Sequence, residues 1–468
     1  MRKKILSKAL IVIAVYALFS LVFNVLQNPA VYHNTLGLIS SNYERTGDAK
    51  QYTINNVKKP FVEITEANSY NWDAIYYLNI RDKLYGDVDP HYADRYAFYP
   101  FFPMIWMISG IRTHHIILLN YLFYGLAIII LSQLLMKDRR SDMFFFILAL
   151  LLPSAAVYYL PYAESLFTLT LALALIGLFK RKYWLYFIAM FCFSMTRPAA
   201  VILIIAFISV NIIYFFRQRN FRHFIKQSLL TTAPLILGWF TVTSIQYYYS
   251  GSWTAYFDTS DLWPKESGFF NNIVDWSVEG FGMTSFSIFM LALPALLYAI
   301  IWGISSLFKK NRREPVSLFS GNEVFIKEYI FNASLLFTAG VLIYFALTQG
   351  NVLNGFFRYT MVIPFFYIIL FQLPEKLDKV HFAYKLSAFV ISMSALIWFL
   401  LNVHYAGNIW RFEYTGLYLF VLITPCILFE KHLSPKAQRV ILLIYILPAI
   451  IWHTYLFNMY LSNVWIFT

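Results

Sequence analysis

The chain has 468 residues, of which 59% are hydrophobic, 20% are aromatic and only 13% are charged. A soluble domain carries roughly 25% charged residues, so this composition excludes an ordinary soluble protein and indicates a membrane protein. The formal net charge of +13 does not indicate a nucleic-acid partner, because the basic residues gather in alternate connections between apolar segments.

Apolar windows recur along the whole chain at the length of a transmembrane helix, which is about 20 residues. Short polar or basic connections separate them, so we predict an all-α polytopic membrane protein organised as one domain over residues 1–468. About thirteen spans are expected, near residues 9–27, 115–136, 143–160, 162–179, 183–196, 198–216, 229–249, 281–307, 328–348, 359–373, 381–403, 414–429 and 440–458.

Most of the 37 basic residues fall in the connections on one side of these spans, and most of the 24 acidic residues fall on the other side. By the positive-inside rule, this asymmetry predicts a cytoplasmic N-terminus, an outer C-terminus and extracytoplasmic acidic loops. We expect the first span to be retained as a signal anchor, since no convincing small-residue cleavage site follows it. No glycosylation sequon lies in an outer loop, which favours a bacterial plasma membrane over an endoplasmic reticulum.

The first outer loop, residues 28–114, is the largest polar segment and contains the stretch SYNWDAIYYL around Asp73. Trp72 and Tyr76 recur there at helical spacing, so we expect an amphipathic helix on the membrane surface. A carboxylate flanked by these aromatic rings is partly desolvated, which makes Asp73 a candidate general base for a hydroxyl group. The alternative is a helix N-cap, because aspartate suits that position, and the sequence leaves both open.

The same loop holds Asp87, Asp89 and His91, followed by Asp94, and these side chains carry oxygen and imidazole ligands for a divalent cation. The cluster supplies fewer ligands than a structural cation needs, so a hydrated acidic loop is favoured and no metal is expected. A second outer loop, residues 250–280, mixes tryptophans with carboxylates and is expected to cap a site that faces the first loop.

Three more charged residues, Glu164, Arg197 and Arg358, lie at the outer ends of predicted spans. An unpaired carboxylate is expensive at that depth, so Glu164 requires a partner or an aqueous cavity. Arginine offers paired donors and a permanent charge, so Arg197 and Arg358 suit a lipid-linked phosphate. The alternatives are snorkelling to lipid headgroups and pairing with Glu164. The similar depth of the two arginines favours a site.

Four motifs occur in order along the chain, and they read NWDAIYYL, AFYPFFPMI, YLPYAESLFTLTLAL and TRPAAVILI. In content and order they resemble motifs of the PIG-V-like (GPI mannosyltransferase II-like) mannosyltransferases of the GT-C glycosyltransferase superfamily. The later segment FRYTMVIPFF is also similar to a family segment, so the resemblance covers roughly residues 70–370. It implies a GT-C-like bundle with a large first extracytoplasmic loop that carries interfacial helices.

The resemblance implies inverting transfer of mannose from a polyprenyl-phosphate donor to a hydroxyl of a glycan or glycolipid acceptor. In that reaction Asp73 would be the catalytic base, while Arg197 and Arg358 would bind the donor phosphate, so no cofactor or metal is required. The expected partners are the donor, the acceptor and membrane lipids, with no nucleic acid. The residues expected to contact the substrate are Trp72, Tyr76, Tyr99 and Glu164.

Two rival functions stay open from the sequence. A GT-C enzyme for another sugar, such as a pentose, glucose or aminoarabinose, would carry similar motifs, because sugar selectivity depends on pocket geometry. A multi-span transporter of lipids or solutes also combines many spans with few buried charges. It predicts internal repeats and charges near mid-span, and the sequence shows neither pattern.

Overall fold

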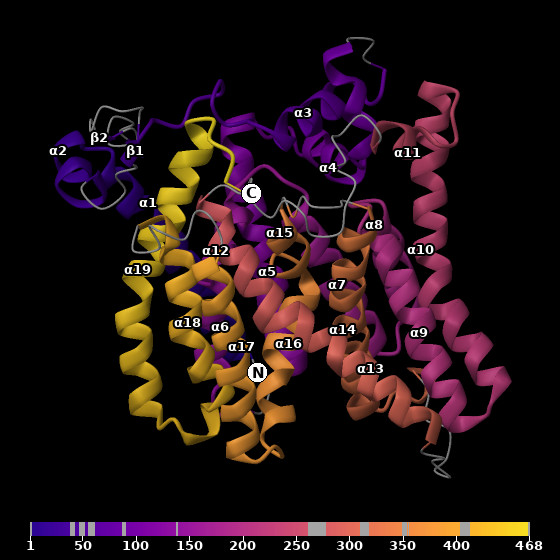
Figure 1. The fold of residues 1–468 in the computed structure, drawn as a ribbon. Coiled ribbons are helices and arrows are strands. Elements are labelled where there is room, and N and C mark those ends of the chain that lie inside the picture. The colour runs from indigo at the N-terminus through magenta and orange to yellow at the C-terminus, as the bar shows by residue number, and fades with distance from the viewer. Residues whose placement is uncertain are drawn as a thin grey trace.

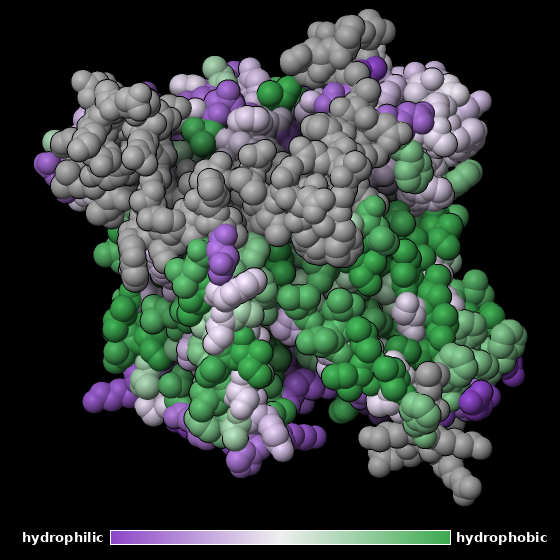
Figure 2. Space-filling model, in the orientation of Figure 1, coloured by the Kyte–Doolittle hydropathy of each residue, from purple (hydrophilic) through white to green (hydrophobic). Residues whose placement is uncertain are grey.

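The computed structural model describes residues 2–37, 43–45, 52–54, 61–86, 90–136, 139–260, 278–308, 318–348, 353, 355–402 and 412–466. Within these ranges the chain is mainly helical, and the long helices form a bundle (Figure 1). Figure 2 shows hydrophobic side chains around the middle of the molecule and hydrophilic side chains toward its upper and lower ends. The prediction of a helical multi-pass membrane protein is therefore confirmed.

The long helices follow the order of the predicted spans. They are α1 (Arg2–Leu26), α5 (Ile116–Leu135), α6 (Asp142–Leu150), α7 (Glu164–Phe179), α8 (Tyr183–Ser194), α9 (Ala200–Gln218), α10 (Phe221–Ser250), α12 (Val278–Ser287), α13 (Leu293–Phe308), α14 (Glu323–Thr348), α16 (Pro364–Leu377), α17 (Phe382–Asn402), α18 (Thr415–Leu428) and α19 (Pro435–Leu461). The short helices are α2 (Pro29–Tyr32), α3 (Asp73–Lys83), α4 (Phe101–Ser109), α11 (Ala255–Ser260) and α15 (Phe356–Thr360). Two short strands, β1 (Tyr43–Arg45) and β2 (Tyr52–Ile54), pair in antiparallel orientation.

Short 3-10 and π segments connect several of these helices. The 3-10 segments are η2 (Pro90–Ala97), η3 (Thr113–His115), η4 (Pro153–Tyr159), η6 (Leu318–Ser320), η8 (Phe412–Tyr414) and η9 (Glu430–His432). The π segments are η1 (His33–Gly37) and η5 (Ile288–Ala292), and η5 joins α12 directly to α13. Helices α3, α4 and α11 lie together at the upper end of the bundle in Figure 1, the end at which α19 finishes.

Among the described residues, eight helices are long and apolar enough to cross a membrane, and one bent pair raises that number to nine. Helices α7, α8 and α18 are apolar but shorter, and α16 has 14 residues. Each of the predicted windows overlaps one of these helices. The multi-span architecture is therefore established, while the larger number of spans stays a prediction.

The predicted span 143–160 is broken in the structure. Helix α6 and the 3-10 helix η4 meet there at 60°. Leu152 precedes Pro153 and has an extended ψ of 141°, because a proline ring disfavours the α conformation of the residue before it. The break therefore follows from the proline, and it turns the chain toward the start of α7.

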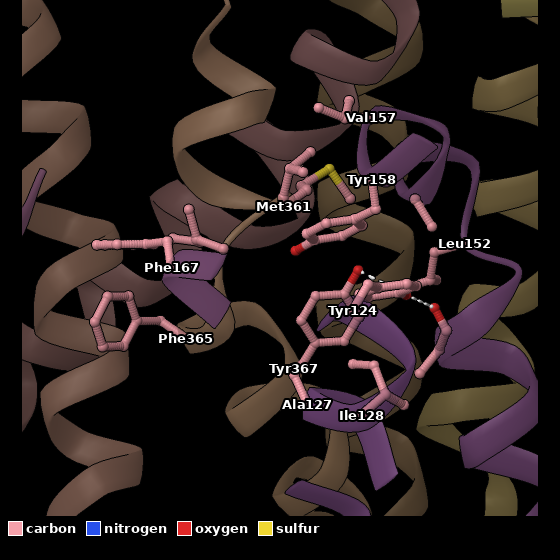
Figure 3. Packing of buried hydrophobic residues seen from close by; sticks show 14 of the residues in the cluster. Tyr124, Ala127, Ile128, Leu152, Val157, Tyr158, Phe167, Met361, Phe365 and Tyr367 are labelled. Atoms are coloured by element: carbon pink, nitrogen blue, oxygen red, sulfur yellow. Dashed lines mark hydrogen bonds between the residues drawn. The ribbon is translucent and has the colours of Figure 1, made fainter. Parts of the chain in front are cut away.

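Buried tyrosines fill the interior where α5, η4 and α16 meet (Figure 3). The rings of Tyr124 and Tyr158 stack with their centroids 3.9 Å apart. The Tyr124 hydroxyl donates to the backbone carbonyl of Ala149 and lies 3.1 Å from the Tyr367 hydroxyl. These rings fill space while their hydroxyls find polar partners, as buried tyrosines require.

Helix α7 occupies the interior of the bundle, and most of its residues are buried. Gly177 allows α8 to pack closely against it, since a Cβ atom at this position would lie 2.5 Å from the backbone nitrogen of Tyr186. The helix begins at Glu164, so close packing of α7 fixes the position of that carboxylate.

A buried ion pair joins α1 to the next two spans. Lys8 Nζ donates to Asp142 Oδ1 of α6 at 2.6 Å and to Ser132 Oγ of α5 at 2.8 Å. Lys8 is fully buried, so its charge depends on these partners rather than on water.

Candidate active site

The candidate active site begins at Glu164, the first residue of α7. Its side chain is only 1% exposed, so its charge must be balanced by protein groups. Two arginines that lie far away in the sequence approach the same oxygen atom of this carboxylate. Arg358 Nη2 lies 2.7 Å from Glu164 Oε1, and Arg197 Nη1 lies 2.5 Å from it.

Arg358 uses every nitrogen of its guanidinium group. Nε and Nη2 donate to Glu164 Oε1 at 3.1 and 2.7 Å, and Nη1 donates to Asp73 Oδ2 at 2.8 Å. The arginine is carried by the short helix α15 and is itself buried. It therefore bridges two carboxylates, one at the start of α3 and one at the start of α7.

Arg197 makes a less directional contact than Arg358. Its Nη1 is close to Glu164 Oε1, but the angle does not satisfy a hydrogen bond, and no other described residue supplies a partner for that nitrogen. Its guanidinium also lies 5.2 Å from the centre of the Tyr359 ring. Aromatic faces attract such cations, so both the Tyr359 ring and the Glu164 carboxylate stabilise the position of Arg197.

These four residues, Asp73, Glu164, Arg197 and Arg358, are called the ionic cluster below. It contains two carboxylates and two arginines, so its formal charges cancel. Glu164 Oε2 is buried and has no hydrogen-bond partner among the described residues. Asp73 is the most accessible member, with 21% of its side chain exposed.

The alternative interpretation of Asp73 as a helix cap is wrong. The N-cap position of α3 belongs to Trp72, and Asp73 is the first helical residue. The Asp73 carboxylate pairs with Arg358. This is one of the two arginines that the sequence analysis assigned to a phosphate, and in the structure its partners are carboxylates. The alternative that an arginine pairs with Glu164 holds for both arginines.

Trp72 has a backbone conformation that is unusual for a bulky residue, with φ at 55° and ψ at −126°. Its ring packs against Trp465 with the centroids 5.0 Å apart. The buried Trp72 Nε1 has no hydrogen-bond partner among the described residues. The residue that precedes Asp73 therefore carries a buried donor that no described residue satisfies.

Tyr76 and Tyr99 lie in other surroundings than the sequence suggested. Tyr76 stacks on Phe98 at 4.5 Å and donates its hydroxyl to Asp94 Oδ2 at 2.9 Å. Tyr99 belongs to a small apolar cluster with Met195, and burial raises the pKa of its phenol. These contacts engage both tyrosines outside the ionic cluster, so the proposed role of both as pocket walls stays a prediction.

Two tyrosines that the sequence analysis did not select lie at the ionic cluster. The Arg358 guanidinium lies 4.8 Å from the centre of the Tyr162 ring. Burial, followed by the charge of Glu164, raises the pKa of the Tyr77 phenol, so this hydroxyl stays protonated. Their spacing in the sequence could have indicated both tyrosines. Tyr77 lies one helical turn after Asp73, and Tyr162 lies two positions before Glu164.

The chain matches no family model, no curated protein and no solved structure. The resemblance to the PIG-V-like enzymes therefore rests on the order of the sequence motifs.

Of the four candidate cation ligands, the structure describes the side chain of Asp94 alone, which accepts the Tyr76 hydroxyl. Asp87 and Asp89 lie outside the described residues, as does the side chain of His91. Residues 261–277 of the second outer loop also lie outside them, and its described part includes α11. Within the described residues, no group of three or more histidine, cysteine, aspartate or glutamate side chains is arranged to hold a metal ion.

An apolar cavity of about 590 Å³ lies between the membrane helices. Helices α13, α14 and α17 contribute Leu293, Leu342 and Phe399 to its wall. Leu353 also lines it, and the carbonyl of Leu353 accepts a hydrogen bond from the first residue of α15 at 3.0 Å. The segment that ends in Arg358 therefore starts at the cavity wall.

Proposed function

We propose that this chain is an inverting glycosyltransferase of the GT-C type, which transfers a mannosyl group from a polyprenyl-phosphate donor to a hydroxyl of a glycan or glycolipid. The observation that carries the proposal is the bridge that Arg358 forms between Asp73 and Glu164, with Arg197 on the same carboxylate. A partly accessible carboxylate paired with one arginine, with a second arginine on the shared glutamate, suits transfer away from a phosphate.

Asp73 is the proposed base because it is the accessible carboxylate, 21% exposed against 1% for Glu164. The acceptor oxygen forms a bond to the anomeric carbon while Asp73 takes the hydroxyl proton. The bond between the anomeric carbon and the phosphate oxygen breaks, and its electron pair leaves with the lipid phosphate. Attack from the face opposite the leaving group inverts the anomeric carbon.

The two arginines are proposed to hold the donor phosphate and to stabilise the charge that develops on it. Arg358 Nη1, which pairs with Asp73 in the structure, is the nitrogen that the phosphate would take over. This exchange moves the cation from the base to the leaving group. Asp73 Oδ2, released from this contact, would be available to accept the proton of the acceptor hydroxyl.

Glu164 is proposed to fix both arginines through one oxygen and to serve the sugar with the other. Its Oε1 is shared by Arg197 and Arg358, whereas the buried Oε2 has no hydrogen-bond partner among the described residues. A buried acceptor without a partner costs free energy, and a sugar hydroxyl would satisfy it. Trp72 directly precedes Asp73, its buried indole nitrogen has no hydrogen-bond partner among the described residues, and it is proposed to contact the sugar.

The apolar cavity is proposed to hold part of the prenyl chain of the donor. Its volume of about 590 Å³ and the aliphatic and aromatic residues around it suit an isoprenoid chain that stays in the bilayer. Leu353 lies on the cavity wall just before α15, which would place the prenyl chain close to the proposed phosphate site at Arg358. The distribution of basic residues puts the proposed reaction on the extracytoplasmic face. The lack of a glycosylation sequon in the outer loops favours a bacterial plasma membrane.

The test is a transfer assay with the purified protein in lipid nanodiscs. Radiolabelled polyprenyl-phosphate mannose is offered together with lipid and glycan extracts from cells that lack the chain. We expect transfer by the wild type and by Asp258→Asn, whose exposed carboxylate accepts hydrogen bonds from Ser252 and Thr254 away from the cluster. Asp73→Asn should fall by at least about 100-fold.

A donor panel separates the related enzymes. Polyprenyl-phosphate glucose, pentose and aminoarabinose are tested under the same conditions, and preference for one of them would replace mannose as the donor. No transfer from any donor, combined with altered solute or lipid uptake by cells that lack the chain, would reject the transferase in favour of a transporter.

A further inference from the structure

The C-terminal end of α19 holds the segment that precedes Asp73. The Asn71 backbone N–H donates to the Tyr460 hydroxyl at 2.9 Å, and Asn71 Nδ2 donates to the Tyr460 carbonyl at 2.7 Å. These partners are 389 positions apart in the chain. Both contacts involve Asn71, which lies two residues before the proposed base.

Further contacts fix the same segment against α19. The Tyr460 hydroxyl donates to the Ser69 carbonyl at 3.3 Å, and Asn458 Oδ1 accepts the Val62 backbone N–H at 2.9 Å. Tyr460 is fully buried. Its hydroxyl therefore accepts from one side of the segment and donates to the other, at a place where unmade hydrogen bonds are costly.

The held segment contains the unusual backbone at Trp72. A bulky residue with φ at 55° costs about 1–3 kcal/mol and persists only where the surrounding contacts determine it. Asn71 on one side is held by Tyr460, and Asp73 on the other side is held by Arg358. If donor phosphate takes over Arg358, the contacts with α19 still hold the segment that carries the base.

We propose that Tyr460 is a positioning residue for Asp73, which acts through Asn71 and the constrained backbone of Trp72. This inference rests on the proposed function, since it names the residue that keeps the base in place after Arg358 has turned to the phosphate. Tyr460 itself does not touch the reacting atoms. Its hydroxyl is the group that matters, because it makes the contacts to Asn71 and Ser69.

The kinetic test compares Tyr460→Phe with Tyr455→Phe in the transfer assay. Tyr455 lies on the same helix, where its ring packs on Phe412 with centroids 4.9 Å apart. We expect Tyr460→Phe to lower kcat about tenfold while KM for the donor stays within about twofold, because a displaced base affects reaction more than binding. Tyr455→Phe should change neither. A wild-type kcat in Tyr460→Phe, or equal losses in both variants, would overturn the inference.

A second measurement tests the contact without any activity. In a chain with Cys192 and Cys426 replaced by alanine, the pair Asn71→Cys and Tyr460→Cys should be joined by a short bifunctional thiol reagent. The control pair Asn71→Cys and Tyr455→Cys should not be joined. If the wild type transfers sugar but the Asn71→Cys and Tyr460→Cys pair is not joined, the positioning role is rejected and the proposed function is not. A cross-link in a protein whose wild type transfers no sugar rejects the proposed function.

Discussion

Arg358 Nη1 lies 2.8 Å from Asp73 Oδ2, although 285 positions separate the two residues in the chain. The same guanidinium donates twice to Glu164, so one side chain links the starts of α3 and α7. A phosphate that binds Arg358 must compete with a carboxylate for the same N–H group. The proposed binding of a lipid phosphate would therefore be sensitive to the charge of Asp73.

Asp73→Asn is therefore expected to bind polyprenyl phosphate more tightly than the wild type. Removing one charged hydrogen bond that opposes binding, worth about 1.5 kcal/mol, lowers Kd about tenfold. Titration of nanodisc-embedded protein with polyprenyl phosphate, followed by tryptophan fluorescence, measures the change. Asp258→Asn is the control and should keep the wild-type Kd. Equal or weaker binding by Asp73→Asn would show that phosphate does not compete for Arg358.

The two arginines should differ in their tolerance of lysine. Arg358 donates through three nitrogens to two carboxylates, an arrangement that a single ammonium group cannot reproduce. Arg197 approaches Glu164 through one nitrogen, which a lysine can replace in part. We expect Arg358→Lys to lose at least about 100-fold in transfer and Arg197→Lys about tenfold. Equal losses would contradict the unequal roles, with the amount of folded protein checked by gel filtration.

The buried pair of Lys8 and Asp142 should matter for stability through its charge balance. Replacing Asp142 alone by leucine leaves a fully buried ammonium group, which costs about 3–5 kcal/mol. The double variant Lys8→Met with Asp142→Leu removes both charges and should recover most of that loss. Thermal unfolding in detergent measures both. A double variant as unstable as Asp142→Leu would show that packing rather than charge dominates.

Gly177 and Gly303 form a matched pair for testing the contact between α7 and α8. A Cβ atom at Gly177 would meet the backbone nitrogen of Tyr186, whereas a Cβ atom at Gly303 has nothing within 4 Å. We expect Gly177→Ala to destabilise the protein by about 1–3 kcal/mol. Gly303→Ala should be neutral or stabilise by about 0.5–1 kcal/mol, because alanine favours a helix. Unfolding midpoints decide between these outcomes, and equal midpoints would refute the close contact.

The helices could be predicted from the sequence because hydropathy over about 20 residues is a local property. The break at Pro153 lies inside the predicted span 143–160, and an apolar window does not reveal where one span turns. Pro153 could have indicated the break, but proline is also tolerated within membrane helices. The thirteen predicted windows outnumber the eight or nine long apolar spans among the described residues, because several apolar helices are shorter than a bilayer requires.

The site could be predicted in part. Glu164 requires a partner at its depth, and the two arginines near span ends were the available cations, so their meeting follows from charge. Tyr76 and Tyr99 were selected as neighbours in a motif, but their rings point to other partners, Phe98 and Tyr256. Sequence proximity does not give the direction of a side chain.

The contact between Asn71 and Tyr460 also has a consequence for biosynthesis. Asn71 leaves the ribosome long before α19 is made, so the partner that holds it does not exist while most of the bundle is being inserted. Arg358 likewise appears after Asp73 and Glu164 have already been synthesised. The contacts that hold the Asn71 segment can therefore form only after α19 has joined the bundle, so the arrangement proposed around Asp73 is completed late in membrane insertion.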